Sequence, residues 1–433
     1  MTMWRPTSLA LVAVVAVPPG AAAQNPGVAA AVERLAPQII EIRHHIHRYP
    51  ELGNRETETA RLVSNHLRDL GFDEVRTGIA VTGVVGVLRG GRPGPVVAIR
   101  ADMDALPVTE DTPFPFKSEV RTTYLGQEVG VAHACGHDIH TAVQLGVASV
   151  LASMRDRIPG TVVFVFQPAE EGPPPGERGG AELMAEEGAL RDPRPDAIFA
   201  LHAMPDLEVG EVGYTSGPAF AASDHFTIVL RGRQAHGASP HLSVDPIVMA
   251  AQTIMAFQTI RSRSLPPLEP SVVTVGIVRG GTRFNIIPSE VHLEGTVRTY
   301  DADVQDTVER RMREILGGVT SAYGGSYEME YARGVPVTIN DESLTERMAP
   351  TLARVVGADN VSLLDPATGA EDFAYFANEV PGFYYRLGTL APGGTSGGLH
   401  TPTFQAADGA VPAGIEVMAN LVLDFLNDVG SEK

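Results

Sequence analysis

The only cysteine of the chain, Cys135, lies in a segment rich in histidines. Residues 133–138 read His-Ala-Cys-Gly-His-Asp, and a further histidine follows at His140. A single cysteine cannot form a disulfide within its own chain, so its thiol is structural, a nucleophile or a metal ligand. Neighbouring thiolate and imidazole groups suit zinc, and also manganese, cobalt or nickel. We therefore expect Cys135 and His137 to bind metal, with a buried structural thiol and a cysteine nucleophile as the alternatives.

Two adjacent carboxylates, Glu170 and Glu171, follow a short apolar run at 161–166. Two carboxylates in a cleft repel each other unless a cation lies nearby. One of them can bind a metal ion, while the other acts as a general base on a water molecule whose pKa the metal lowers to about 7. The alternative is an acidic turn exposed to solvent, but the apolar run before the pair favours a buried position.

Further polar side chains follow three other short apolar runs. Open α/β sheets bind ligands at the carboxyl ends of their strands, so these residues are expected to converge on one crevice in or next to a metal site. Taken singly, such an aspartate can be a turn former or a helix cap, and such a histidine can be an ordinary core or surface residue. They are Asp102 and Asp104 after 96–99, His202 after 197–201, and His400 beyond 383–387.

The apolar runs and the segments between them predict the fold. Short buried strands alternate with helical stretches such as 28–70 and 141–154, which is typical of a mostly parallel α/β sheet flanked by helices. Residues 217–333 differ, because strands and helices follow there in the order β-α-β-β-α-β of a ferredoxin-like α+β unit. We predict a discontinuous catalytic domain, residues 28–216 and 334–430, interrupted by an inserted domain at 217–333.

The first 23 residues differ in composition from the rest. One positive charge, Arg5, precedes an apolar run and a small-residue stretch at 21–23, the layout of a cleavable signal peptide. This predicts an exported protein, periplasmic or secreted, with an uncleaved anchor as the alternative. The run is too short to span a bilayer, and we expect no membrane span in the mature chain. A formal net charge of -19 argues against binding to nucleic acid or to an anionic membrane.

From Ile42 to its end, the sequence resembles a known family through ten blocks in order. The family is that of the dinuclear metallo-amidohydrolases, which include hippurate hydrolase, indole-acetyl-amino-acid hydrolase, aminoacylase and related carboxypeptidases. The blocks are HRYPELG (47–53), RADMDALP (100–107), HACGHDIHT (133–141), FQPAEEG (166–172), ALH (200–202), HGASPH (236–241), NIIPSE (285–290), GTVR (295–298), GAEDF (369–373) and LH (399–400).

The resemblance implies a divalent metal cofactor with two ions per subunit, manganese or zinc, with cobalt or nickel as alternatives. It implies that Glu170 is the general base and acid, and that Asp104 lies beside the metal site and orients a histidine. The metal ligands that it implies are Cys135, His137, Glu171, His202 and His400.

The resemblance also gives roles to the inserted domain, as a lid and as the contact of a homodimer. His236 would stabilise the developing oxyanion, in many relatives from a partner subunit. Asn285 and Arg298 match positions that hold the carboxylate of the substrate, for which arginine offers a fork of donors. For Arg298, the alternative is a salt bridge on the surface of a strand.

The function that follows is hydrolysis of the amide bond of N-acyl amino acids, of the hippurate or N-acetyl kind. An exported carboxypeptidase or dipeptidase acting on short peptides is the nearest alternative. A non-catalytic binding protein is a further one, although such a protein has no need for a base such as Glu170. The proline-rich insertion at 173–178 departs from shorter family members, and we expect it to reshape the acyl pocket.

Overall fold

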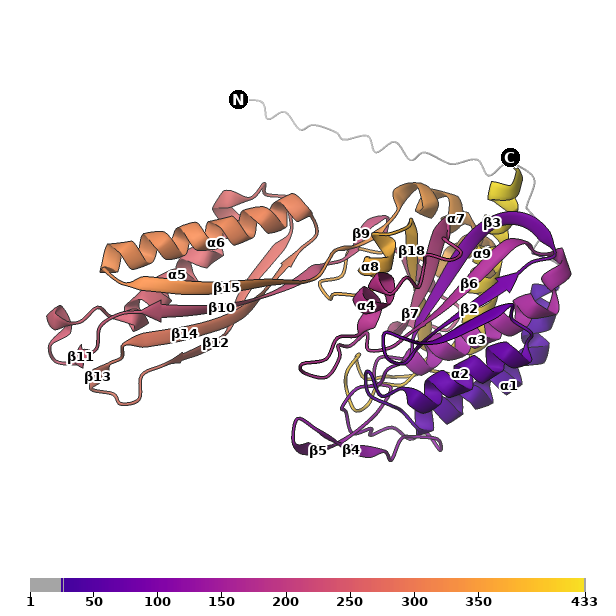
Figure 1. The fold of residues 1–433 in the computed structure, drawn as a ribbon, viewed down its shortest axis with the longest axis horizontal. Coiled ribbons are helices and arrows are strands. Elements are labelled where there is room, and N and C mark those ends of the chain that lie inside the picture. Colours follow the sequence, from indigo (N-terminus) through magenta and orange to yellow (C-terminus); the bar gives the residue numbers. More distant parts are fainter. Residues whose placement is uncertain (1–24, 26, 432–433) are drawn as a thin grey trace, which may run out of the picture.

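The computed structural model describes Asn25 and residues 27–431, so the predicted signal segment at 1–23 lies outside the described residues. Figure 1 shows a large α/β body and, beside it, a smaller elongated body formed by residues 222–335. We call these the large body and the small body.

The large body is built on an eight-stranded sheet whose centre is parallel. In the order β6-β3-β7-β18, each strand runs parallel to its neighbour, which confirms the predicted mostly parallel sheet. Strand β2 is buried along nearly its whole length, and it pairs antiparallel with both of its neighbours. Across the sheet the strands are β1 (Glu74–Ile79), β2 (Gly83–Arg89), β6 (Pro159–Gln167), β3 (Arg92–Asp102), β7 (Ala197–Glu208), β18 (Gly382–Leu390), β8 (Val212–Tyr214) and β17 (Val361–Leu363).

Both faces of this sheet are covered, because its central strands are apolar on both sides. In β3, Val97 and Ile99 pack into one core, whereas Ala98 between them packs into the other. The first core is completed by the longer helices, and the second by two short ones. The first group is α1 (Val28–Arg48), α2 (Thr57–Asp69), α3 (His137–Ser153), α7 (Glu342–Val356) and α9 (Ala410–Ser431), and the second is α4 (Gly180–Glu186) and α8 (Ala374–Ala377).

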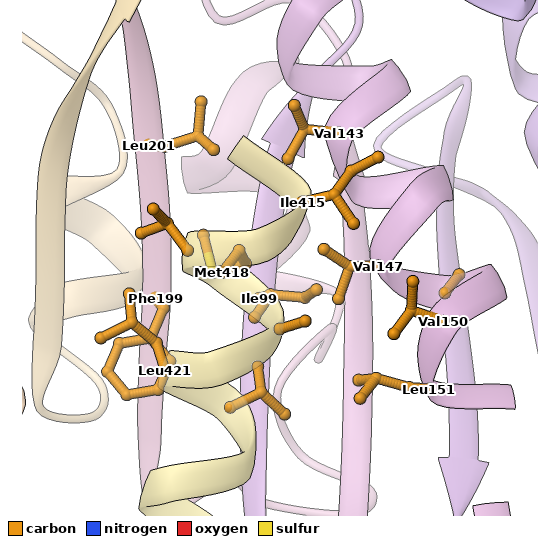
Figure 2. Packing of buried hydrophobic residues seen from close by; sticks show 14 of the residues in the cluster. Ile99, Val143, Val147, Val150, Leu151, Phe199, Leu201, Ile415, Met418 and Leu421 are labelled. Carbon is orange, nitrogen blue, oxygen red and sulfur yellow. The ribbon is translucent and has the colours of Figure 1, made fainter. Parts of the chain in front are cut away.

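Helix α9 runs through the first core. Figure 2 shows its residues Ile415, Met418 and Leu421 between Val147 of α3 and Phe199 of β7. Among the described residues, α9 is the one helix long and apolar enough to cross a membrane, and 72% of that apolar stretch is buried inside the protein. Its apolar character is therefore accounted for by packing in the core.

The small body is a four-stranded antiparallel sheet with two helices packed on one face. Its sheet order, β12-β14-β10-β15, is that of a ferredoxin-like unit. The chain enters this sheet at Ala222 rather than at 217, because β9 (Gly217–Phe220) pairs with β16 (Thr338–Asn340) on the large body. The elements are β10 (Ala222–Arg231), α5 (Pro246–Thr259), β12 (Ser271–Gly280), β14 (Glu290–Thr299), α6 (Ala302–Tyr323) and β15 (Ser326–Val335).

Candidate metal centre and active site

A sharp turn at Gly136 directs the side chains of Cys135 and His137 toward the same cluster of ligand atoms. Gly136 precedes α3 with φ of 89°, a left-handed conformation that favours glycine. A Cβ atom there would lie 2.7 Å from the Cβ of Ala203, so the close approach also requires glycine. The ligand atoms of Cys135, His137 and His202 consequently lie within 4.8 Å of one another. In an extended loop, these first two side chains would point apart.

The thiol of Cys135 is at the centre of the cluster. Its Sγ lies 3.5 Å from Nε2 of His202 and 3.3 Å from Nε2 of His400, which is itself 2.9 Å from Oε1 of Glu171. Cys135 therefore belongs to two groups of three ligand atoms, one with His137 and His202 and one with Glu171 and His400. A shared ligand between two neighbouring groups is what a paired metal centre requires.

Hydrogen bonds hold the imidazole rings so that one nitrogen of each faces the cluster. Nδ1 of His137 is 3.2 Å from Oδ1 of Asp104, and Nδ1 of His202 donates to the carbonyl oxygen of Ala203 at 2.9 Å. The other carboxylate oxygen of Asp104 accepts from the backbone N–H of Glu171 at 3.0 Å. Asp104 thus orients both an imidazole and the glutamate loop, an arrangement common around metal ligands.

His140, although part of the same motif, is fully occupied by hydrogen bonds. Its Nδ1 donates to Asp102 at 2.5 Å, and its Nε2 accepts from the backbone N–H of Ala203 at 2.7 Å. This histidine therefore joins α3 to the ends of β3 and β7 and leaves no nitrogen free for a metal ion.

The two adjacent glutamates have opposite pKa shifts. Burial, followed by the charges of Glu371 and Glu171, raises the pKa of Glu170 well above its usual range. Burial also opposes ionisation of Glu171, but the hydrogen bond from His400 and the charges of His137 and His400 outweigh it and lower the pKa of Glu171. One glutamate is thus poised to stay charged as a ligand, while the other is poised to exchange a proton.

The cluster fits a divalent cation. Nε2 of His137 is buried and has no hydrogen-bond partner in the described part of the chain. Burial and the charges of Glu171 and Glu170 raise the pKa of the Cys135 thiol well above its usual range. A nucleophilic cysteine needs the opposite shift, so the surroundings disfavour that alternative, whereas a bound cation would stabilise the thiolate.

A cavity of about 380 Å³ opens onto the cluster. Cys135, Glu170, Glu171, His202 and His400 line it, and the ligand atom of His137 lies just beneath. Residues 173–178 of the proline-rich insertion are not among those that line it, and their effect on the acyl pocket stays a prediction. Glu177 of the insertion instead pairs with Arg55 at 2.5 Å, which ties the insertion to the loop before α2.

Three predicted residues of the small body do not line this cavity. His236 is exposed on β11 (Ala235–His236), which pairs with β13 (Ile286–Ile287) at the end of the small body that is farthest from the large body in Figure 1. Asn285 directly precedes β13, and Arg298 lies near the end of β14. Within one chain, the structure therefore gathers the metal-ligand candidates around the cavity, and the three residues of the small body are not among those that line it.

Sequence reasoning gave no role to several groups around the site. Arg100 is fully buried, and its guanidinium lies 2.8 Å from Asp102, 3.0 Å from Glu371 and 3.1 Å from Asp372. Arg100, Glu371 and Asp372, for which no role was predicted, all lie in the blocks RADMDALP and GAEDF, and these blocks were the signal that the sequence offered. Arg386 of β18 also lines the cavity, and no sequence motif marked it.

A mostly parallel α/β sheet that carries thiol, imidazole and carboxylate groups around one cavity defines a metal-dependent hydrolase. Residues 98–424 match the family model described as "Peptidase family M20/M25/M40". The chain belongs to this family, as the resemblance predicted, and is an amidohydrolase or peptidase of that family.

Individual relatives differ in their named activity. The chain is 38% identical over 360 residues to thermostable carboxypeptidase 1 of Saccharolobus solfataricus, covering 83% of this chain and 87% of that one. It is 38% identical over 357 residues to N-acetyl-L-cysteine deacetylase of Bacillus subtilis, covering 82% of this chain and 81% of that one. A crystal structure of a dinuclear metal-binding peptidase of the M20 family from Bacillus subtilis superposes with a TM-score of 0.77, at 33% identity, covering 91% of this chain and 99% of that one.

Proposed function

We propose that this protein hydrolyses the amide bond of N-acyl amino acids, with Glu170 as the general base. The observation that carries the proposal is the position of Glu170. Its carboxylate lines the same cavity as the ligand candidates, with Oε2 3.9 Å from Nε2 of His137 and its side chain only 12% exposed. A pure binding site has no use for a proton-exchanging carboxylate at that point.

The ligand set that we propose is Cys135, His137, Glu171, His202 and His400, holding two divalent metal ions, manganese or zinc. When bound, such ions polarise the scissile carbonyl group and acidify water. Glu170 takes the proton of the attacking water and later delivers it to the departing amino-acid nitrogen, which needs a carboxyl group whose pKa lies above the usual range.

We further propose a homodimer in which His236 of the partner subunit completes the site and stabilises the oxyanion. Two features support it. His236 is far from the cavity of its own chain, and the small body exposes apolar side chains on α5 and on its edge strand β12. These side chains are Ile247, Val248, Met255, Val272 and Val278. Asn285 and Arg298 would hold the substrate carboxylate.

The second candidate is a carboxypeptidase or dipeptidase, which the similarity to thermostable carboxypeptidase 1 favours. Both reactions place a free carboxylate on the leaving amino acid, and they differ on the acyl side. For location, we propose that residues 1–23 direct export to the periplasm or outside the cell. Sequencing the amino terminus of the exported protein tests this, and an intact Met1 on cytoplasmic protein would contradict it.

A substrate panel tests the reaction. The purified protein is given hippurate, N-acetyl amino acids and dipeptides after chelation, and again after addition of manganese, zinc, cobalt or nickel. We expect hydrolysis of N-acyl amino acids to stop on chelation and return with one metal. Activity confined to dipeptides would establish the second candidate, and stoichiometric metal binding without any hydrolysis would contradict both.

A further inference from the structure

Arg386 lies beside the metal-ligand cluster and forms no ion pair with any residue that the structure describes. It lies on β18, and in the parallel pairing of β18 with β7 its position is opposite His202. Paired residues of neighbouring strands point to the same face of a sheet, and both side chains line the cavity of about 380 Å³. The fold thus places a guanidinium group next to a candidate metal ligand.

The guanidinium of Arg386 lies against an aromatic ring and forms no ion pair with a carboxylate of the described residues. Its Cζ lies 5.3 Å from the ring centroid of Phe220, which also lines the cavity. Its Nη2 is buried and has no hydrogen-bond partner within the described residues. The charge of Asp206 acts on Arg386, but this aspartate is exposed and forms no ion pair with Arg386 in the described structure.

Arg100, the other arginine beside this site, differs from Arg386 in its ion pairs. Arg100 is buried and forms ion pairs with three carboxylates, so its charge is fully used in holding the end of β3. A buried donor that makes no hydrogen bond costs free energy, and a ligand that brings an acceptor can remove this cost. Arg386 is therefore prepared for an anion that enters the cavity.

We propose that Arg386 is a substrate-binding residue that recognises a carboxylate of the substrate inside the cavity of its own subunit. The planar fork of an arginine, stacked on Phe220, matches a carboxylate through two parallel hydrogen bonds. Its place beside His202 holds that carboxylate near the reacting amide. The inference rests on the proposed function, and it adds a binding group from the large body to those expected from the small body.

The carboxylate can come from the leaving amino acid or from the acyl group, and four substrates separate these sources. N-acetyl-methionine carries the first carboxylate, N-succinyl-methioninamide the second, N-succinyl-methionine both, and N-acetyl-methioninamide neither. We expect Arg386→Met to lower kcat/KM at least tenfold, mainly through KM, for the substrates that carry the recognised carboxylate. The neutral substrate should be hydrolysed as before, and Arg386→Lys should recover part of the loss.

Arg347 provides a matched control, because its Cζ also lies 5.3 Å from a phenylalanine ring, that of Phe425, away from the cavity. Arg347→Met should leave all four substrates unchanged. An equal loss on all four substrates with Arg386→Met, or no loss on any, would overturn the proposal.

A binding measurement separates failure of this inference from failure of the proposed function. Succinate and N-acetyl-methionine are titrated calorimetrically into the metal-loaded wild-type protein and the Arg386→Met variant. Tenfold weaker binding of either ligand to the variant supports the assignment even if no substrate of the panel is hydrolysed. Equal binding to both proteins rejects it, whether or not the wild-type protein is an amidohydrolase.

Discussion

The two bodies hold their predicted functional residues in different ways. In the large body, Cys135 and His137 are buried, and hydrogen bonds to neighbouring groups fix the orientation of the imidazole. In the small body, His236 is exposed, and its ring accepts one hydrogen bond, from the backbone N–H of Ala238 at 3.0 Å. The difference shows that the large body buries and orients its metal-ligand candidates, whereas His236 of the small body is open to solvent.

The strongest test of the large body is Glu170→Gln. We expect kcat to fall by about 10²–10⁴, the usual contribution of a general base, because an amide cannot take up the proton of water. Metal content, measured by atomic emission, should stay the same, since Glu170 is not among the proposed ligands. Glu182→Gln on the exposed face of α4 is the matched control. A Glu170→Gln variant with full activity would remove the proposed role.

The corresponding test of the small body is His236→Ala. We expect kcat to fall by roughly 10²–10³, the usual loss on removing an oxyanion donor. If the donor comes from the partner subunit, mixing this variant with Glu170→Gln gives heterodimers with one complete site. Random mixing should then restore about a quarter of wild-type activity, because half of the dimers are mixed and each has one active site of two. No recovery in a mixture shown to exchange subunits would contradict the shared site.

A smaller effect, on metal affinity, is expected from Asp104→Asn. It tests whether hydrogen bonds within the large body orient the metal ligands before metal binds. The carboxylate of Asp104 lies 3.2 Å from Nδ1 of His137 and also accepts a hydrogen bond from the backbone of Glu171. Losing such an orienting group typically costs about 10–100-fold in metal affinity. Metal titration by calorimetry measures this, with Asp303→Asn on exposed α6 as the control. Unchanged affinity would show that His137 is oriented by other contacts.

The smallest effect concerns the contribution of His47, which contacts Asp138 next to the metal-binding loop, to the stability of the fold. Burial lowers the pKa of His47, but the charge and hydrogen bonds of Asp138 and Glu110 outweigh it and raise the pKa from 6.5 to about 9. The charged ring therefore adds stability that is complete below pH 6.5 and is lost as the pH rises through 9. The shift corresponds to a contribution on the order of 3 kcal/mol.

Thermal unfolding between pH 6 and pH 9.5 measures this contribution. We expect His47→Gln to lower the melting temperature at pH 6 and to flatten its decline toward pH 9. Hydrogen exchange in β10 of the small body should be unchanged at each pH, as the internal control. An identical pH dependence in both proteins would contradict the raised pKa.

Much of the fold could be predicted because the apolar runs are short, continuous and separated by helical stretches. Strands such as 96–99 and 161–166 can be buried only in the middle of a sheet covered on both faces, which is where the structure has them. The antiparallel direction of β2 could not be predicted, because a buried strand has the same composition whichever way its neighbours run.

The candidate site was predictable to the same extent. Polar residues directly after buried strands emerge at the edge of the sheet, so the convergence of Asp104 and His202 on one crevice could be predicted, while their roles stay predictions. The role of His140 could not be found this way, since nothing in its motif shows that Ala203 and Asp102 occupy both of its nitrogens.

The sequence by itself determined which groups could do chemistry, because residue type decides what a side chain can ligate, donate or accept. It also determined that they follow buried strands. Only the tertiary structure decided which of these groups lie next to one another. The pairing of β18 with β7 sets Arg386 opposite His202, and the turn at Gly136 directs Cys135 inward. The contacts of Arg386 with His202 and of Cys135 with His202 and His400 join residues far apart in the chain, so they depend on the order and register of the strands, which local sequence does not encode.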